Sequence, residues 1–168
     1  MVSGFAGRFE IVPPLAEHLN SYLISSISYL TERTEEIHMN HLTQIAAKLP
    51  EYGLDAMLIV SESGERYALG FHGEGLVLVT PQETHYTTDG RYIEAAREQI
   101  AGARISLVSA GSGHLAQARA YIQEHGLKKV GFESGAMTVD AHARYARELP
   151  CTLVPAQGLL DGLRASKD

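Results

Sequence analysis

The chain has 168 residues, of which 45% are hydrophobic and 20% charged, and its net charge is −6 at pH 7. This length and composition are typical of one globular domain that buries a sizeable core. The negative charge and the lack of any Lys/Arg cluster in the sequence argue against non-specific nucleic-acid binding, which depends on neutralising phosphates.

Cysteine content and hydropathy favour a cytoplasmic protein. Cys151 is the one cysteine of the sequence, so no intrachain disulfide can form, and its apolar surroundings predict a buried, inert thiol. No stretch reaches the ~18 consecutive apolar residues of a membrane span. Charged residues and prolines interrupt the N-terminus, so we expect neither a signal peptide nor a membrane contact.

The first 36 residues differ in style from the rest and are predicted to be an N-terminal extension. The Pro13–Pro14 pair and the segment LNSYLISSISYL indicate a loosely attached stretch with one short helix. Met39 begins a run that would serve as a natural chain start. We therefore hypothesise that the first 38 residues are an extension or result from an upstream start site, which the intact mass of the native protein would decide.

From residue 37 onward, helical and strand patterns alternate. Apolar residues at helical spacing predict helices at 37–49, 62–69, 90–101, 112–125, 138–149 and 157–168. Short apolar or β-branched runs predict strands at 55–60, 75–80, 84–88, 104–109, 129–133 and 151–155. This alternation is typical of an α/β sandwich with a mostly parallel sheet, and the predicted hairpin at 75–88 makes the sheet mixed.

Several motifs that would assign chemistry are incomplete. The glycine-rich turn SAGSGHLAQA (109–118) has Ala116 where the dinucleotide fingerprint needs its third glycine, and it lacks the P-loop lysine. No G-x-S-x-G nucleophile elbow is present. His38 and His41 lie three residues apart on a predicted helix, but no further ligand completes a metal site there, so solvated helix histidines are favoured.

A glycine-rich loop within RYALGFHGEGLVLVT (66–80) is a more specific feature. Three glycines surround Phe71 and His72 between a predicted helix and a predicted strand. Because such loops usually run over the surface, we expect His72 and Glu74 to be exposed. Phe71 is either an exposed loop aromatic or a plug of the core.

The segment TTDGRYIEAA (87–96) contains an arginine in an unusual place. Asp89 suits the N-cap of the predicted helix, whereas Arg91 would put a cation in the first turn, against the macrodipole. Two explanations are open. In the first, the charge is paired within the domain, either between Arg91 and Asp89 or through a pair that involves Glu94. In the second, Arg91 and Tyr92 face an interface that supplies a carboxylate.

Together, four segments resemble the N-terminal domain of the creatinase/prolidase/aminopeptidase P family. They are RYALGFHGEGLVLVT, TTDGRYIEAA, KVGFESGAMT and GLLDGLRASKD. The family shows R-Y-x-T-G-F-x-G, then T-D-x-R-Y-x-x-x-A, then V-G-F-E with a following Thr, and an L-R-x-x-K-D/S linker. The resemblance covers residues 37–168, with Leu69 in place of the usual Thr, while residues 1–36 have no counterpart. It implies a three-layer α/β sandwich with a ribonuclease H-like motif.

The resemblance also implies a function that depends on a second domain. The family's catalytic domain has a pita-bread fold, holds two divalent ions, usually Mn or Co, through two Asp, two Glu and a His, and hydrolyses Xaa-Pro bonds. We expect that domain after Asp168 and expect this chain to be inactive alone, with no catalytic or metal-binding residue of its own. Its expected partners are the catalytic domain, a second subunit in a homodimer and a proline-containing peptide. The candidate cleft or interface residues are Phe71, His72, Asp89, Arg91 and Tyr92.

Two other functions remain open from the sequence. Related folds occur in proteins that have lost peptidase activity and bind protein partners, including histone chaperones. Creatinase uses the same architecture as an amidinohydrolase. Metal ligands encoded downstream of codon 168 would favour an enzyme, and their loss would favour the binding module.

Overall fold

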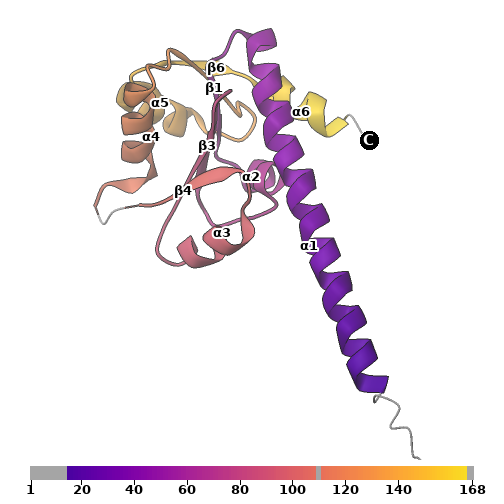
Figure 1. Ribbon diagram of the computed structural model, residues 1–168. Helices are drawn as coiled ribbons and strands as arrows, with labels where there is room; N and C mark the ends of the chain where they lie inside the picture. Colours follow the sequence, from indigo (N-terminus) through magenta and orange to yellow (C-terminus); the bar gives the residue numbers. More distant parts are fainter. Residues whose placement is uncertain (1–14, 109–110, 166–168) are drawn as a thin grey trace, which may run out of the picture. The chain divides into compact units, whose positions relative to one another are not determined.

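The computed structural model describes the backbone of residues 15–108 and 111–165, with side chains described for 20–34, 41–108 and 111–165. The chain divides into two compact units, Met1–Arg33 and Thr34–Asp168. All strands that the structure describes belong to the second unit (Figure 1).

Helices and strands alternate along the second unit, as predicted. The helices are α1 (Leu15–Lys48), the 3-10 helix η1 (Leu49–Tyr52), α2 (Glu62–Leu69), α3 (Ile93–Gln99), α4 (Gly113–Glu124), α5 (Val139–Glu148) and α6 (Gln157–Ala165). The strands are β1 (Ala56–Ile59), β2 (Leu76–Val79), β3 (Thr84–Thr88), β4 (Ala103–Leu107), β5 (Lys129–Phe132) and β6 (Thr152–Pro155). The observed strand ends lie within two residues of the predicted ones.

The strands form one mixed sheet of six strands in the order β4-β3-β2-β1-β5-β6. Strand β2 is antiparallel to both of its neighbours, whereas the pairs β1–β5, β3–β4 and β5–β6 are parallel. The parallel strands therefore end at one edge of the sheet, and β2 begins there. We call this the carboxyl edge.

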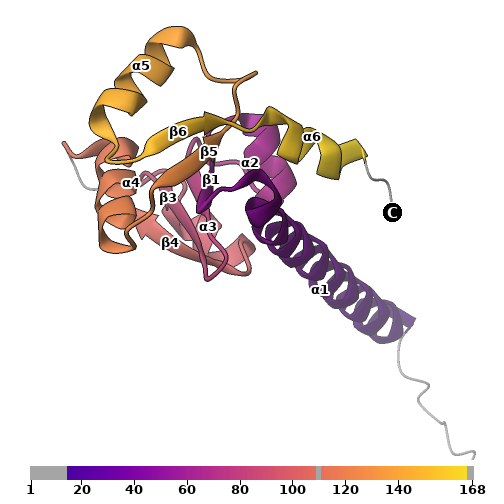
Figure 2. The same ribbon diagram turned by 90° about the horizontal axis from the view of Figure 1, so that it is seen from above.

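Helices cover both faces of the sheet and create two cores. On one face, Met57 and Ile59 of β1 pack with α2, α3, α6 and the part of α1 after Thr34. On the other face, Ala56 and Leu58 pack with α4 and α5, which lie together on one side of the sheet (Figure 2). Since successive side chains of a strand point to opposite faces, burial on both faces accounts for the continuous apolar runs of the strands. The predicted mixed, mostly parallel α/β sandwich is confirmed.

The prediction for the N-terminal helices was wrong. One short helix was expected within residues 1–33 and a separate one from residue 37, but α1 is continuous over 34 residues. No glycine or proline occurs between Leu15 and Lys48, so nothing in the covalent chain breaks the backbone pattern. Residues 1–14 of the predicted extension lie outside the described part of the chain.

Candidate functional site

The predicted site residues come together at the carboxyl edge of the sheet. The loop at 70–75 enters β2 at this edge, and β3 ends there before Asp89. An ion pair of 2.7 Å between Arg91 Nη2 and Glu74 Oε2 joins the two segments. We call this cluster the edge site, and its residues are Phe71, His72, Glu74, Asp89, Arg91 and Tyr92.

Helix α2 leads into the glycine-rich loop and is fixed at both ends. Ser61 caps its first turn, since its hydroxyl accepts from the backbone N–H of Gly64 at 2.9 Å. The buried carboxylate of Glu133 accepts the backbone N–H groups of Val60 and Ser61, both at 2.9 Å. Gly70 ends the helix with a φ of 66°, a left-handed conformation that favours glycine. The loop therefore starts from a rigid helix.

A buried carboxylate, Glu65 of α2, organises the loop from below. Glu65 is 4% exposed, and its Oε1 accepts from the Tyr86 hydroxyl and from the backbone N–H of Gly73 at 3.0 Å. Its Oε2 lies 2.7 Å from Nδ1 of His72. Burial and the hydrogen bond to Glu65 raise the pKa of Tyr86 above its ordinary value. Sequence reasoning missed Glu65, although its place on the same helical face as Ala68 and Leu69 was a signal.

Phe71 is a core residue, which settles the alternative left open by its sequence. It is 7% exposed and contacts the Tyr86 ring edge-on, with 6.2 Å between the ring centroids. The Thr88 hydroxyl donates to the carbonyl of Gly73 at 2.7 Å and holds the loop on the strand. Gly75 must be a glycine, because a Cβ there would come within 2.5 Å of the Thr87 carbonyl oxygen. His72 is less exposed than expected, with 24% of its side chain accessible.

Glu74 is a second residue of the site whose role the sequence did not reveal. Its φ of 50° is the one positive value at a non-glycine residue in the described chain, a conformation that costs about 1–2 kcal/mol. Arg91 holds its carboxylate at 2.7 Å, and the Tyr92 hydroxyl lies at 3.4 Å. Glu74 keeps 53% of its side chain exposed, as expected. The strained backbone thus fixes a carboxylate at the surface.

Asp89 does not cap the helix, so that prediction was wrong. Helix α3 begins at Ile93 with Tyr92 at the N-cap position. The carboxylate of Asp89 instead accepts the backbone N–H of Arg91 at 2.8 Å and its guanidinium Nη2 at 2.6 Å. A hydrogen bond from an aspartate carboxylate to the backbone N–H two residues later is typical of a turn. Because residues 89–92 form this turn, the helix begins about one turn later than predicted.

Arg91 therefore lies before the helix and does not oppose its macrodipole. It pairs within the domain with Asp89 and Glu74, while Glu94 pairs with Arg97 at 3.2 Å. The bonds from Arg91 hold the pKa of Asp89 below its ordinary value. Arg91 also lies over the Tyr92 ring, 5.0 Å from its centroid, and 62% of its side chain is exposed. The edge site thus presents a fixed guanidinium to the surface.

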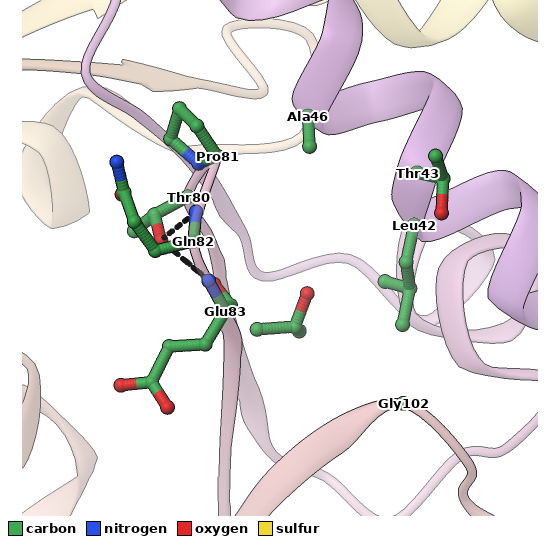
Figure 3. Close-up of a pocket in the computed structure, with 9 residues that line it drawn as sticks. Leu42, Thr43, Ala46, Thr80, Pro81, Gln82, Glu83 and Gly102 are labelled. Atoms are coloured by element: carbon green, nitrogen blue, oxygen red, sulfur yellow. Dashed lines mark hydrogen bonds between the residues drawn. The ribbon is translucent and has the colours of Figure 1, made fainter.

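An open recess lies at the edge of the sheet opposite the carboxyl edge. It measures about 200 Å³ and lies between α1 and the hairpin turn (Figure 3). Its lining residues are Leu42, Thr43, Ala46, Thr80, Pro81, Gln82, Glu83, Thr84 and Gly102. The Thr80 hydroxyl accepts backbone N–H groups within the turn, and the Glu83 carboxylate points away from Leu42 and Thr43 to bond the Tyr121 hydroxyl at 2.9 Å. The Thr80 hydroxyl and the Glu83 carboxylate are thus engaged in contacts within the domain, and the candidate site is the edge site.

The histidines and the cysteine have structural surroundings. His41 is not solvated as expected, because it stacks on Tyr67 at 4.2 Å and its Nδ1 lies 2.8 Å from the Tyr67 carbonyl oxygen. The side chain of His38 lies outside the described residues. Burial raises the pKa of the Cys151 thiol. Among the described residues no group of three or more His, Cys, Asp or Glu side chains could hold a metal ion, so these residues do not fit a metal centre.

Within 15–108 and 111–165, none of the helices combines the length and the apolar character that crossing a membrane requires.

Comparison with known proteins identifies the fold. Residues 41–166 match the family model described as the creatinase/prolidase N-terminal domain. An uncharacterized peptidase of Bacillus subtilis, YqhT, is 32% identical over 119 residues, which cover 70% of this chain and 33% of that protein. The chain thus spans about one third of the length of this curated relative.

Solved structures agree with the sequence match. An Xaa-Pro dipeptidase from Bacillus anthracis superposes with a TM-score of 0.72 at 28% identity, over 78% of this chain and 37% of that one. The N-terminal domain of the cytoplasmic peptidase PepQ from Mycobacterium tuberculosis gives a TM-score of 0.65 at 31% identity, over 74% of this chain and 98% of that one. The chain therefore belongs to the creatinase/prolidase N-terminal domain family.

Proposed function

We propose that this chain is the non-catalytic N-terminal domain of an Xaa-Pro peptidase and that its edge site shapes the substrate cleft or the subunit interface. The observation that carries this proposal is the exposed guanidinium of Arg91, fixed between Asp89 and Glu74. Two similar proteins are an Xaa-Pro dipeptidase, at 28% identity, and the peptidase PepQ, at 31% identity, and the first of them supports the substrate class.

The geometry of Arg91 suits recognition of an acceptor group. Its Nε and Nη2 donate to Asp89 and Glu74, and no hydrogen bond from Nη1 occurs among the described residues. Nη1 is therefore the donor that an outside carbonyl or carboxylate would use, and a guanidinium already held by two carboxylates loses little conformational freedom on binding. The edge site is therefore organised before a peptide or a subunit arrives.

The chemistry of the reaction belongs to other parts of the protein in this proposal. A catalytic domain with two divalent ions, Mn or Co, would hydrolyse the proline-containing peptide, since the described residues of this chain offer no metal centre. The edge site would bind and orient the peptide or complete a homodimer. The proposed location is the cytoplasm, as for the relative PepQ.

Replacement of Arg91 tests the role of the edge site. In the intact gene product, Arg91→Ala should lower kcat/KM for an Xaa-Pro peptide about tenfold or weaken the dimer in sedimentation, because the fixed donor is lost. Arg97→Ala is the matched control, since Arg97 is also exposed and paired with a glutamate on α3. Unchanged kinetics and unchanged sedimentation for Arg91→Ala would remove the edge site from the proposal.

Reading the gene downstream of codon 168 tests the function itself. Two Asp, a His and two Glu at metal-site spacing would support a peptidase, whereas a coding sequence without them would support a binding module. The 168-residue chain alone, assayed with Mn(II) and an Xaa-Pro peptide, should show no turnover. Turnover by the isolated chain would refute the assignment as a non-catalytic domain.

A further inference from the structure

Burial of the Glu65 carboxylate is energetically unfavourable in itself. It is 4% exposed, and its carboxylate accepts from the Tyr86 hydroxyl, Nδ1 of His72 and the backbone N–H of Gly73, with the N–H of Gly75 at 3.4 Å. A buried charge is costly unless every oxygen is satisfied, and apolar side chains usually hold a loop at lower cost. A fully bonded buried carboxylate is therefore a sign that a particular arrangement of its partners is needed.

The bond between Glu65 and His72 determines where the imidazole carries its proton. A carboxylate only accepts hydrogen bonds, so Nδ1 of His72, at 2.7 Å, must be the donor. In the neutral ring, Nε2 is then an unprotonated acceptor. Nδ1 faces the buried Glu65, and 24% of the His72 side chain is exposed. No hydrogen bond to Nε2 occurs among the residues that the structure describes.

We propose that Glu65 is a positioning residue of the edge site, which fixes the His72 ring so that Nε2 faces outward as an acceptor for a peptide N–H group. This inference rests on the proposed function, and it adds the residue that sets the tautomer and the group on the peptide that is recognised. Phe71, Thr88 and the packing of Gly75 keep the loop from moving, so the direction of Nε2 is fixed as well.

Glu62 provides a matched control on the same helix. It is exposed, pairs with Arg66 at 2.9 Å and forms no hydrogen bond to the loop among the described contacts. Its pKa is held below the ordinary value by Arg66 and, to a smaller extent, by His72. Glu62→Gln therefore removes one negative charge near His72 without touching the bond that sets the tautomer.

Imidazole ¹⁵N NMR of the 168-residue chain tests the positioning directly. We expect the Nδ1–H tautomer of His72 in the wild type and in E62Q. In Glu65→Gln, the amide oxygen should face the Oε1 donors, Tyr86 and Gly73, and its NH₂ group should then donate to Nδ1, which shifts the ring toward the Nε2–H tautomer. An Nε2–H tautomer in the wild type, or no change in E65Q, would overturn the inference.

Kinetics of the intact gene product test the outward acceptor. E65Q and His72→Asn should each raise KM for an Xaa-Pro peptide about tenfold. The value of kcat should stay within about twofold of the wild type, because each variant loses a binding contact while the reaction centre is unchanged. Asn keeps a donor near the Nδ1 position but has no Nε2. His72→Gln, which places an amide near the Nε2 position, should recover part of the loss, and E62Q should match the wild type.

The possible failures are distinguishable. If the tautomer shifts in E65Q but KM stays unchanged in E65Q and His72→Asn, Nε2 does not bind the peptide and the inference is wrong, while the proposed peptidase function stands. If the intact gene product hydrolyses no Xaa-Pro peptide in any form, the proposed function fails and the role assigned to Nε2 fails with it.

Discussion

At the scale of single residues, two buried carboxylates connect separate parts of the chain. Glu65 joins α2 to the glycine-rich loop and to Tyr86, and Glu133 joins the end of β5 to the start of α2. Each is surrounded by donors and each is at most 4% exposed. Both lie at the carboxyl edge, so the edge site rests on groups whose hydrogen bonds are already made.

Glu133 should make a large contribution to stability. It is 1% exposed and accepts from the backbone N–H groups of Val60 and Ser61 and from the Ser61 hydroxyl. Glu133→Ala removes the acceptor of both backbone N–H groups and leaves Ser63 Oγ, at 3.2 Å, as the remaining acceptor for the Ser61 hydroxyl, so the free energy of unfolding should fall by about 3 kcal/mol. Urea titration followed by circular dichroism measures the change.

A half-exposed glutamate gives the control for Glu133. Glu148 lies 3.7 Å from Arg147 near the end of α5, and ion pairs of this kind, with an exposed arginine, contribute at most about 1 kcal/mol. Glu148→Ala should therefore leave the urea midpoint nearly unchanged. Equal losses for the two variants would show that the Glu133 hydrogen bonds are not what holds β5 to α2.

Single residues were the least predictable level of this structure. The sequence pointed to His72, Asp89 and Arg91, but not to Glu65 or Glu74 as their partners. Both partners come from contacts between residues seven or more positions apart, such as Glu65 with His72 and Glu74 with Arg91, which local patterns do not contain. Asp89 has the right residue type for a helix cap, and only the folded turn shows that its carboxylate is used by Arg91 instead.

At the scale of elements, the sequence patterns were far more informative. Strand β1 is continuous and apolar because both faces of the sheet are covered, and this pattern was recognisable from the sequence. The exception was α1, whose Ser-rich first half looked like a loose segment. Propensity is a weak guide to where a helix ends when neither glycine nor proline interrupts it.

Packing of α4 on the sheet should make stability sensitive to alkaline pH. Burial, and then the hydrogen bond to Glu83, raise the pKa of Tyr121 from 10.0 to about 12. A pKa raised by folding means that the native state holds its proton longer than the unfolded state. This contribution is complete below about pH 10 and is lost as the pH rises from about 10 to about 12.

Tyr121→Phe should flatten this alkaline dependence. The free energy of unfolding is measured in urea between about pH 8 and about 12. Above about pH 10 it should fall less steeply with pH for the variant than for the wild type. Some pH dependence should remain in the variant, because the pKa values of Tyr86 and Tyr145 are also raised. Tyr52→Phe is the control, because Tyr52 is 44% exposed. An unchanged slope in Tyr121→Phe would contradict the assignment.

At the scale of the whole molecule, the two units differ in how they bury apolar surface. Six large apolar side chains in the N-terminal part of α1 are more than half exposed: Tyr22, Leu23, Ile24, Ile27, Tyr29 and Leu30. The second unit instead buries Leu42, Ile45 and Leu49 of the same helix and of η1 in the core. Isolated helices gain little stability of their own in water, so the folding energy should reside in the second unit.

Removal of residues 1–33 should therefore leave the second unit folded. A chain that begins at Thr34 keeps Leu42 and Ile45, which are 5% and 0% exposed, and its urea midpoint should match that of the 168-residue chain. A chain that begins at Lys48 loses both side chains from the core, at a cost of about 2–5 kcal/mol for each buried leucine or isoleucine. It should unfold at far lower urea or fail to fold. A large loss of stability on removal of residues 1–33 alone would show that the first unit is part of the cooperative fold.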